Sequence, residues 1–327
     1  MRDNKKRKKQ SRVLKIVGIS LTSVVLGFFV LFITAYFITG TVFFNFALDA
    51  TFASVANAPK DLVTKLPTPR LSEEWFGEVE REEKQVESDD GYKLHAYFVP
   101  AEEESNVFVI SIHGYRGKSL EMTFYAQKFH DAGYNVLLPD LKGHGESEGK
   151  YIGMGYLDRF DVLKWIDLIT QMNPEAIIVL HGVSMGGAAV MSATGEELPP
   201  NVVCAIEDCG FSNVYFQFNF VVKNVMRLPF APIIMSSAAL TARAKLKISL
   251  KEMDIISQLK KSKTPTMFIH GSEDNFVPLY MLDEVYKANN QIEKEKLVVE
   301  GASHAYSATK DPDTYFSSVL GFITKYI

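Results

Sequence analysis

Residues 16–46 contain no charged side chain, and this limits what the chain can fold into more than any other feature. About 20 apolar residues are enough for a helix to span a bilayer. The run exceeds the roughly 7–15 apolar residues of a cleavable signal peptide. We therefore expect a transmembrane anchor over residues 16–46, a basic tail over residues 1–15 and a linker over residues 47–74. Because the sheet pattern described below starts after residue 70, removal of residues 1–48 is expected to leave a folded body.

Positive charge lies on one side of this run only. Residues 1–15 carry eight Lys and Arg side chains and one Asp, a net charge of +7, so the rest of the chain carries −11. Because basic flanks stay in the cytoplasm, we expect a single-pass cell-membrane protein with a cytoplasmic N-terminus and an extracellular body. An acidic body is a poor nucleic-acid binder, so no nucleic-acid partner is expected. The alternative is a signal peptide cleaved near Ala56-Asn57-Ala58, although that site lies far beyond the apolar run.

From about residue 75 to 327 the hydrophobic pattern is that of one α/β domain. Two alternating segments flank Asp89-Asp90-Gly91, as in an antiparallel hairpin. Short apolar runs then alternate with segments in which apolar residues have helical spacing. This pattern predicts a mostly parallel central sheet with helices on both faces. The expected strands are residues 107–112, 134–138, 176–180, 202–206, 266–269 and 296–299, and the expected helices are residues 120–132, 156–171, 185–194 and 313–326.

The interval between the strands at 202–206 and 266–269 is too long for a simple crossover. It is rich in aromatic residues, and it enters and leaves at strand ends. We interpret residues 212–260 as a helical cap insertion over the carboxyl edge of the sheet. Our candidates for lining a pocket under this cap are Phe216, Phe218 and Phe220.

A serine lies at the end of one expected strand. The segment Gly182-Val183-Ser184-Met185-Gly186 stands between that strand and a helix rich in small residues. So sharp a turn leaves no room for side chains two residues to either side of the serine, and it exposes the hydroxyl at a helix N-terminus. This context favours Ser184 as a nucleophile over an idle serine in a glycine-rich turn.

A nucleophilic serine needs a base and an acid that orients the base. His304 follows the last expected strand, whereas the other six histidines lie at positions better explained by packing or loop shape. Asp274 follows the strand at 266–269 and is the preferred acid, with Asp208 as the alternative. The chain order Ser184, Asp274, His304 is that of an α/β-hydrolase triad.

The oxyanion that forms on nucleophilic attack needs preorganised N–H donors. The backbone of Met185, directly after the nucleophile, is one candidate. The loop after the strand at 107–112 should supply the other. There we expect the N–H of Tyr115, with that of Arg116 as the alternative.

Several further motifs resemble those of the α/β-hydrolase superfamily. They are HGYRG (113–117), PDLKGHGESEG (139–149), GVSMGGA (182–188), EDCGFS (207–212), IHGSEDNFVP (269–278) and GASH (301–304). The chain looks most like the bacterial capped serine hydrolases that are esterase- or acylaminoacyl-peptidase-like. The resemblance implies the α/β-hydrolase fold, no cofactor, and structural roles for Asp140 and the turn at 143–147. A serine rather than an aspartate at the sharp turn departs from the dehalogenase and epoxide-hydrolase branches.

Cys204 and Cys209 lie on one strand and its exit, which favours two buried thiols over a disulfide, and no His/Cys spacing suggests zinc. We therefore expect a membrane-anchored serine hydrolase that cleaves a small acyl ester, thioester or amide through an acyl-enzyme, without metal or cofactor. A peptidase of the same fold is less favoured, because nothing in the sequence marks a site for a peptide amino-terminus. The other alternative is a non-catalytic surface protein on a hydrolase fold.

Overall fold

The computed structural model describes residues 2–55, 72–290 and 293–327. Within these residues the centre is an eight-stranded sheet with the order β1-β2-β4-β3-β5-β6-β7-β8. β1 and β2 form an antiparallel hairpin, β2 is antiparallel to β4, and all other neighbours are parallel. This confirms the predicted hairpin and the mostly parallel sheet. The strands are β1 (Glu82–Glu87), β2 (Lys93–Val99), β3 (Val107–Ile112), β4 (Asn135–Pro139), β5 (Ile177–Val183), β6 (Val202–Asp208), β7 (Thr266–Gly271) and β8 (Lys294–Val299).

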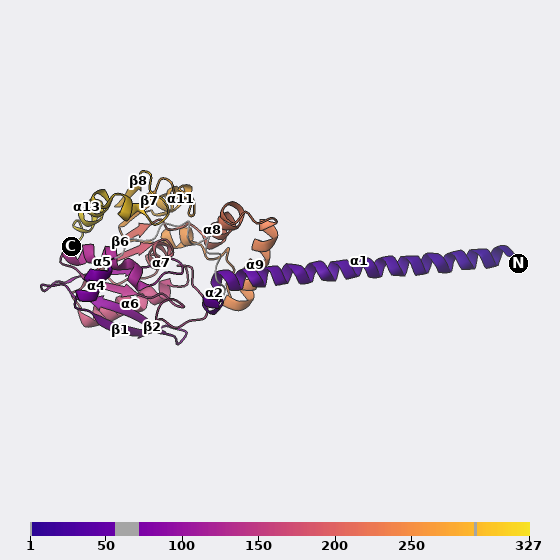
Figure 1. Ribbon diagram of the computed structural model, residues 1–327, viewed down its shortest axis with the longest axis horizontal. Helices are drawn as coiled ribbons and strands as arrows, with labels where there is room; N and C mark the ends of the chain where they lie inside the picture. Colours follow the sequence, from indigo (N-terminus) through magenta and orange to yellow (C-terminus); the bar gives the residue numbers. More distant parts are fainter. Residues whose placement is uncertain (1, 56–71, 291–292) are drawn as a thin grey trace.

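Helices cover both faces of the sheet (Figure 1), and each face has its own buried core. Along β3, Phe108 and Ile110 belong to one core and Val109 to the other, which explains the continuous apolar run of this strand. The helices of the body are α4 (Glu73–Glu78), α5 (Thr123–Asp131), α6 (Arg159–Met172), α7 (Met185–Ala193), α10 (Ile255–Leu259), α11 (Tyr280–Ala288), α12 (Ser307–Lys310) and α13 (Pro312–Ile323), with a 3₁₀ turn η1 (Ser119–Met122) before α5.

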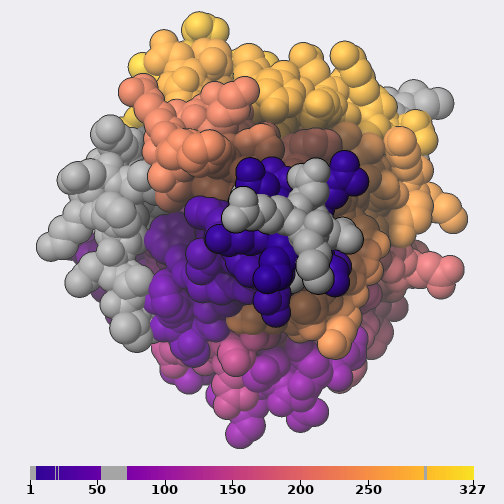
Figure 2. Space-filling view, turned by 90° about the vertical axis from the view of Figure 1, so that its right-hand side faces the viewer, coloured from indigo at the N-terminus to yellow at the C-terminus, as the bar shows by residue number. Residues whose placement is uncertain are grey.

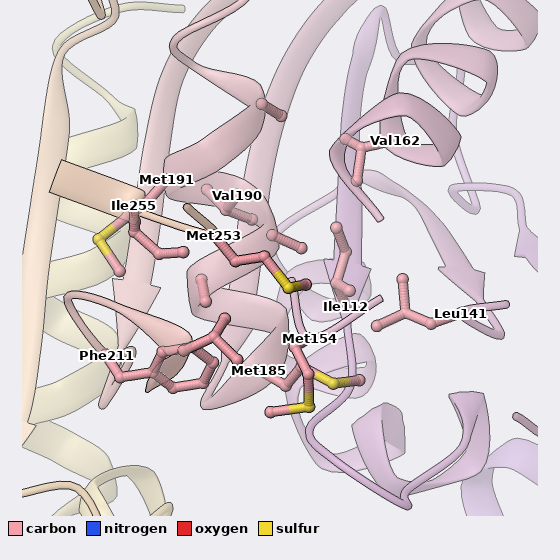
Figure 3. Packing of buried hydrophobic residues seen from close by; sticks show 14 of the residues in the cluster. Ile112, Leu141, Met154, Val162, Met185, Val190, Met191, Phe211, Met253 and Ile255 are labelled. Carbon is pink, nitrogen blue, oxygen red and sulfur yellow. The ribbon is translucent and has the colours of Figure 1, made fainter. Parts of the chain in front are cut away.

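The helix that follows the candidate nucleophile is buried along its whole length. Every residue of α7 is buried, and its small side chains let the helix approach the sheet closely. Figure 3 shows Met185, Val190 and Met191 of α7 in a cluster that includes Ile112 and Phe211. α7 therefore has a close-packed support, and its first turn has a fixed position relative to the sheet.

A second feature stands apart from the sheet. α1 (Arg2–Leu48) is one continuous helix of 47 residues that projects from the body as a rod (Figure 1). Its described side chains from Lys5 to Thr39 are exposed, apart from half-buried Tyr36. Among the residues that the structure describes, Lys5–Leu48 forms one helix long and apolar enough to cross a membrane, by length and composition.

The end of α1 belongs to the body, and this corrects the predicted boundaries. Its last residues are buried in the larger core, so the body already includes the end of α1, whereas sequence analysis places residues up to 46 in the anchor and starts the body near residue 75. Bilayers and protein cores select the same apolar side chains, so the sequence pattern shows no break between the two environments. Residues 56–71, which hold most of the predicted linker and the Ala56-Asn57-Ala58 site, lie outside the described residues. The buried residues at the end of α1 are Phe43, Phe44, Ala47 and Leu48.

The insertion between β6 and β7 is helical and packs against α1. It consists of α8 (Val214–Phe220), a π-helical turn η2 (Val221–Val225) and α9 (Ala231–Leu246). α10 packs against α7 and α11, so the cap ends before α10 rather than at residue 260. Figure 2 looks at this end of the molecule, with α1 pointing at the viewer and the cap, in salmon and orange, beside its base.

α1 and α9 are in close contact at one glycine. A Cβ on Gly40 would collide with the side chain and backbone of Ser237. The Ser237 hydroxyl donates to the carbonyl of Tyr36, and Lys245 Nζ donates to Asn45 Oδ1 at 2.7 Å. These contacts fix α1 to the cap.

Candidate active site

Ser184 occupies the turn between β5 and α7 in a conformation that side-chain-bearing residues rarely adopt, with φ 57° and ψ −115°. Its N–H donates to the carbonyl of Asp208 at 2.7 Å, which ties the turn to β6. A Cβ on Gly182 would collide with the backbone of Gly186, and a Cβ on Gly186 would collide with the carbonyl of Ile112. The flanking glycines are therefore sterically required, as the sequence pattern indicated.

The structure brings the three residues of the predicted triad together. Ser184 Oγ lies 2.8 Å from His304 Nε2, and His304 Nδ1 lies 2.7 Å from Asp274 Oδ2. Their exposed fractions are only 7, 6 and 6%, so bulk water competes little for these hydrogen bonds. An ionised carboxylate only accepts, so Nδ1 carries the imidazole proton and Nε2 faces the hydroxyl as an acceptor. This geometry permits Nε2 to take the serine proton.

The loop after β7 holds Asp274 in place through several donors. Oδ1 accepts from the N–H groups of Phe276 and Val277, both at 2.8 Å. His270 Nε2 lies 3.3 Å from Oδ2 and 2.9 Å from the Val277 carbonyl. Burial raises the pKa of Asp274, but neighbouring His304 and hydrogen bonds from both imidazoles outweigh burial, so this pKa lies well below its usual value. The carboxylate stays ionised, and His270, which sequence analysis had assigned to packing or loop shape, also supports it.

Asp208, the alternative acid, has another position. It ends β6, and its carbonyl accepts the N–H of Ser184. Burial raises the pKa of its carboxyl to about 6, although neighbouring His270 opposes this shift. The carboxylate hydrogen-bonded to His304 Nδ1 is that of Asp274, so the geometry favours Asp274 as the orienting acid.

The expected oxyanion donors differ in whether their N–H groups already donate a hydrogen bond within the protein. The N–H of Arg116 donates to His144 Nε2 at 3.1 Å and is therefore occupied. Within the part of the chain that the structure describes, no hydrogen bond is recorded from the N–H of Met185 or of Tyr115. The loop of Tyr115 lies against the nucleophile, since a Cβ on Gly114 would be 3.4 Å from the Cβ of Ser184. The geometry thus favours Tyr115 over Arg116.

Two buried histidines hold this loop. His113 Nε2 accepts the N–H of Leu141 at 3.0 Å, as His144 Nε2 accepts that of Arg116. Each ring turns Nδ1 toward a backbone carbonyl, so the proton sits on Nδ1. Burial lowers the pKa of both imidazoles, that of His144 to about 3. Both rings therefore stay neutral and keep an acceptor nitrogen at physiological pH.

A mainly apolar cavity, called here the Ser184 cavity, opens beside the nucleophile. Its walls come from the end of α1, the Tyr115 loop, the cap and the loop after β7. The Phe276 ring, which lines it, lies 5.0 Å from the His304 ring. Such a lining excludes water from the reacting atoms and favours an apolar substrate group. The apolar side chains that matter most below are Phe43, Phe46, Phe218, Val221 and Met226.

Of the three aromatic residues expected at the pocket, the structure places Phe218 in the Ser184 cavity. Phe216 and Phe220 line a separate hollow on the outer side of the cap together with Tyr280, and Phe216 is 58% exposed. This corrects the expectation for both residues. Their segment is the helix α8, in which residues two apart point to nearly opposite sides, whereas residues four apart share a side.

Sequence analysis missed the contribution of α1. Phe43, Phe46 and Ala47 line the Ser184 cavity. Tyr115 donates its hydroxyl proton to the Ala47 carbonyl at 2.7 Å, and Arg116 Nη2 donates to the Phe46 carbonyl at 2.6 Å. These bonds satisfy carbonyls that the end of a helix leaves without partners. The one available signal was length, because the uncharged run exceeds the ~20 residues that a span needs.

One cluster at the site has metal-ligand composition. Ligand atoms of Cys209, Asp274 and His304 all lie within 4.8 Å of one another. Burial raises the pKa of the Cys209 thiol well above its usual value, so the thiol stays protonated, whereas a metal needs the thiolate. His304 and Asp274 already bond to each other. The cluster fits a hydrogen-bonded triad better than a metal centre. Cys204 and Cys209 are both free and buried, as predicted.

Comparisons with known proteins agree with the fold. The family model of the S33 serine aminopeptidases matches residues 103–228. The YqkD protein of Bacillus subtilis is 27% identical over 251 residues, which cover 76% of this chain and 81% of that protein. The esterase YjfP of Escherichia coli is 24% identical over 217 residues, 63% of this chain and 83% of that protein.

Solved structures give the same result. An esterase from Pyrococcus furiosus superposes with a TM-score of 0.63 at 22% identity, covering 82% of this chain and 94% of that chain. An acylaminoacyl peptidase from Pyrococcus horikoshii superposes with a TM-score of 0.57 at 18% identity, covering 77% of this chain and 43% of that chain. The chain has the α/β-hydrolase fold, and its similarities are to esterases and peptidases.

Proposed function

We propose that this protein is a membrane-anchored serine hydrolase that cleaves an acyl ester, or a related thioester or amide, through an acyl-enzyme. The observation that carries the proposal is the hydrogen-bonded series Ser184–His304–Asp274 at a strained turn that faces an apolar cavity. The proposed reaction uses groups of the protein and water alone, so it needs neither metal nor cofactor.

In the acylation half, Ser184 Oγ attacks the carbonyl carbon of the substrate while His304 Nε2 takes the hydroxyl proton. The carbonyl electron pair moves to oxygen, and the N–H groups of Met185 and Tyr115 are the donors proposed to stabilise this oxyanion. When the carbonyl re-forms, the bond to the leaving alcohol oxygen breaks and His304 returns the proton to that oxygen. The ionised carboxylate of Asp274 stabilises the transient imidazolium.

Deacylation repeats these steps with water. His304 Nε2 takes a proton from water, the hydroxide attacks the acyl carbon, and a second oxyanion forms at the same donors. Its collapse breaks the bond to Ser184 Oγ, which regains the proton from His304. The net reaction converts one ester and one water into one carboxylic acid and one alcohol.

The chemistry of the cavity favours an ester over a peptide. No Asp or Glu is found among the described residues that line it, and its charged lining side chain is Arg116. A peptide amino-terminus carries a positive charge, which Arg116 would repel and which the apolar lining would desolvate without compensation. A peptidase activity remains the second candidate because the family model is that of serine aminopeptidases.

The membrane location in this proposal rests on α1. Its exposed apolar surface suits lipid, and its basic residues, such as Lys5 and Lys9, precede the apolar part. The charge rule then gives one span with the N-terminus in the cytoplasm and the catalytic domain outside. Protease added to intact cells should remove the body, whereas loss of the body only after lysis would contradict this orientation.

A fluorophosphonate probe tests the chemistry directly, since it labels an activated serine. We expect labelling of the wild type at Ser184 and none in Ser184→Ala. A panel of p-nitrophenyl esters of increasing chain length, beside aminoacyl amides, would then rank esterase against peptidase activity. A folded wild type that is neither labelled nor active on the panel would contradict the proposal and favour a non-catalytic surface protein.

A further inference from the structure

α1 passes from an exposed environment into the wall of the active site without a break. Phe28 is 70% exposed, and Val42 is still 56% exposed. One residue later Phe43 is only 8% exposed and lines the Ser184 cavity. The same helix therefore presents apolar side chains first to its surroundings and then to the candidate nucleophile.

The distance along the helix is short. About 20 residues at 1.5 Å per residue cross the hydrocarbon core, so a span that starts at Ile16 is complete near Tyr36. There the Tyr36 hydroxyl donates to Ser236 Oγ of α9 at 3.1 Å, which marks the beginning of the body. Tyrosine is also enriched at membrane interfaces. Phe43 follows seven residues later, about 10 Å along the axis. The Ser184 cavity thus begins next to the membrane surface in this arrangement.

The cap forms the opposite wall. The rings of Phe43 and Phe218 meet edge-to-face with their centroids 5.8 Å apart, so α1 and α8 touch over the cavity. Val221 and Met226 continue the lining. Just beyond them in the chain the apolar side chain of Phe230 is 73% exposed. Figure 1 shows α8 and α9 at the end of the body from which α1 projects.

We propose that the substrate is a membrane-resident acyl ester whose acyl chain enters the Ser184 cavity from the bilayer, between the end of α1 and the cap. This inference rests on the proposed function. An ester dissolved in water would gain nothing from an entrance beside a transmembrane helix. A lipid-like ester would keep its acyl chain in apolar surroundings beside Ser184, because Phe43 of α1 and Met226 of the cap line the cavity there.

The first experiment uses the full chain reconstituted in phosphatidylcholine vesicles. The probe is a fluorogenic ester with two long chains, which does not exchange between vesicles during the assay. It is placed either in the vesicles that hold the protein or in separate protein-free vesicles at the same total concentration. We expect hydrolysis at least ten-fold faster in the shared membrane, whereas equal rates in the two arrangements would overturn the proposal.

Soluble p-nitrophenyl acetate separates this failure from failure of the proposed function. If the acetate is cleaved at equal rates in both arrangements and the lipid ester is not favoured in the shared membrane, the hydrolase stands and membrane delivery is wrong. If neither the acetate nor the lipid ester is cleaved and the fluorophosphonate does not label Ser184, the proposed function itself fails, and this inference with it.

The second experiment tests whether the end of α1 guides the acyl chain into the Ser184 cavity. Phe46→Ala removes a ring that lines the cavity, and Phe28→Ala removes a matched ring from the exposed part of the same helix. We expect Phe46→Ala to lower the ratio of lipid-ester to acetate kcat/KM at least five-fold, and Phe28→Ala to leave the ratio unchanged. Equal losses on both substrates in Phe46→Ala, or an equal change of the ratio in Phe28→Ala, would overturn a route along the end of α1.

Discussion

The two sides of the active site are built in different ways. The side with Ser184 is fixed by local sterics, because Gly182 and Gly186 have no space for a Cβ and the strained turn follows. The side with Phe43 and Phe218 is fixed by the meeting of two helices that are far apart in the chain. The difference separates two questions, since the first side governs whether a bond is broken and the second governs which molecule is bound.

The largest effect is expected from substitutions on the side of the site that holds Ser184. Ser184→Ala or His304→Ala should lower kcat/KM on the order of 10³–10⁶-fold with little change in the melting temperature, because each removes a reacting group. Asp274→Asn should cost about 10⁴-fold if it orients the base, by analogy with a serine protease. Steady-state kinetics beside thermal melting provide the measurement. If Asp208→Asn abolishes activity and Asp274→Asn leaves kcat/KM unchanged, our assignment of the orienting acid to Asp274 is wrong.

A pair of truncations would test whether the end of α1 belongs to the body. Removal of residues 1–35 keeps the buried end of the helix, so we expect a cooperative melt and retained cleavage of a short ester. Removal of residues 1–48 deletes Phe44 and Leu48 from the core, at a cost of several kcal/mol, since each large buried side chain contributes about 2–5 kcal/mol. Melting curves in the same detergent would compare them. Equal melting temperatures would show that the α1 end is dispensable to the fold.

The buried carboxyl of Glu207, on the side of the site that holds Ser184, should make the stability of the fold depend on pH. Burial raises the pKa of Glu207 to about 8, against the opposing effect of His270. The folded chain then keeps a proton that the unfolded chain loses above about pH 4.5. The free energy of unfolding therefore falls as the pH rises from there through 8. Glu207→Gln should reduce the fall in stability between pH 5 and 8.5, on the order of 2–4 kcal/mol.

The matched control for this change is Glu197→Gln, which removes an exposed glutamate near the same strand. Thermal melts at several pH values would be compared for both variants and the wild type. If Glu207→Gln keeps the full pH dependence of the wild type, the carboxyl is ionised in the folded chain and our assignment of its charge is wrong.

The smallest effect is expected on the side of the site that α1 and the cap form. Phe218→Ala should change the chain-length profile of kcat/KM by about 1–3 kcal/mol for the acyl groups that reach it. Phe216→Ala is the matched control on the same helix, because its ring faces the outer hollow. The rate of labelling by a small fluorophosphonate should move far less in either variant. An equal loss across all chain lengths in Phe218→Ala would indicate damage to the cap rather than a change of specificity.

The sequence predicted what depends on local rules. Strand periodicity located the sheet, and the glycines around Ser184 identified the sharp turn. Because parallel strands bring their carboxyl ends to one edge, Asp274 and His304 could be assigned without knowing any distance. Even the choice between Tyr115 and Arg116 depended on one contact, the acceptor nitrogen of His144, which no local rule predicts.

What depends on packing could not be predicted. Phe216, Phe218 and Phe220 are the same residue type within five positions, and only the helical geometry of α8 separates them into two sides. Gly40 has a clear role once Ser237 lies against it, but in the sequence it is one more glycine of a long apolar run. Phe43 and Phe28 are equivalent until the position of the body along α1 is known.

The close contact at Gly40 and Ser237 gives α1 a fixed rotational phase relative to the catalytic domain. An α-helix turns by about 100° per residue, so one residue inserted between Gly40 and Phe43 would rotate the pocket wall by about that angle and shift it along the axis by about 1.5 Å. The same insertion ahead of Tyr36 would change only how the basic tail is oriented relative to the body. The outer part of α1 is therefore free to vary in length, whereas its last turns must keep their register with the active site.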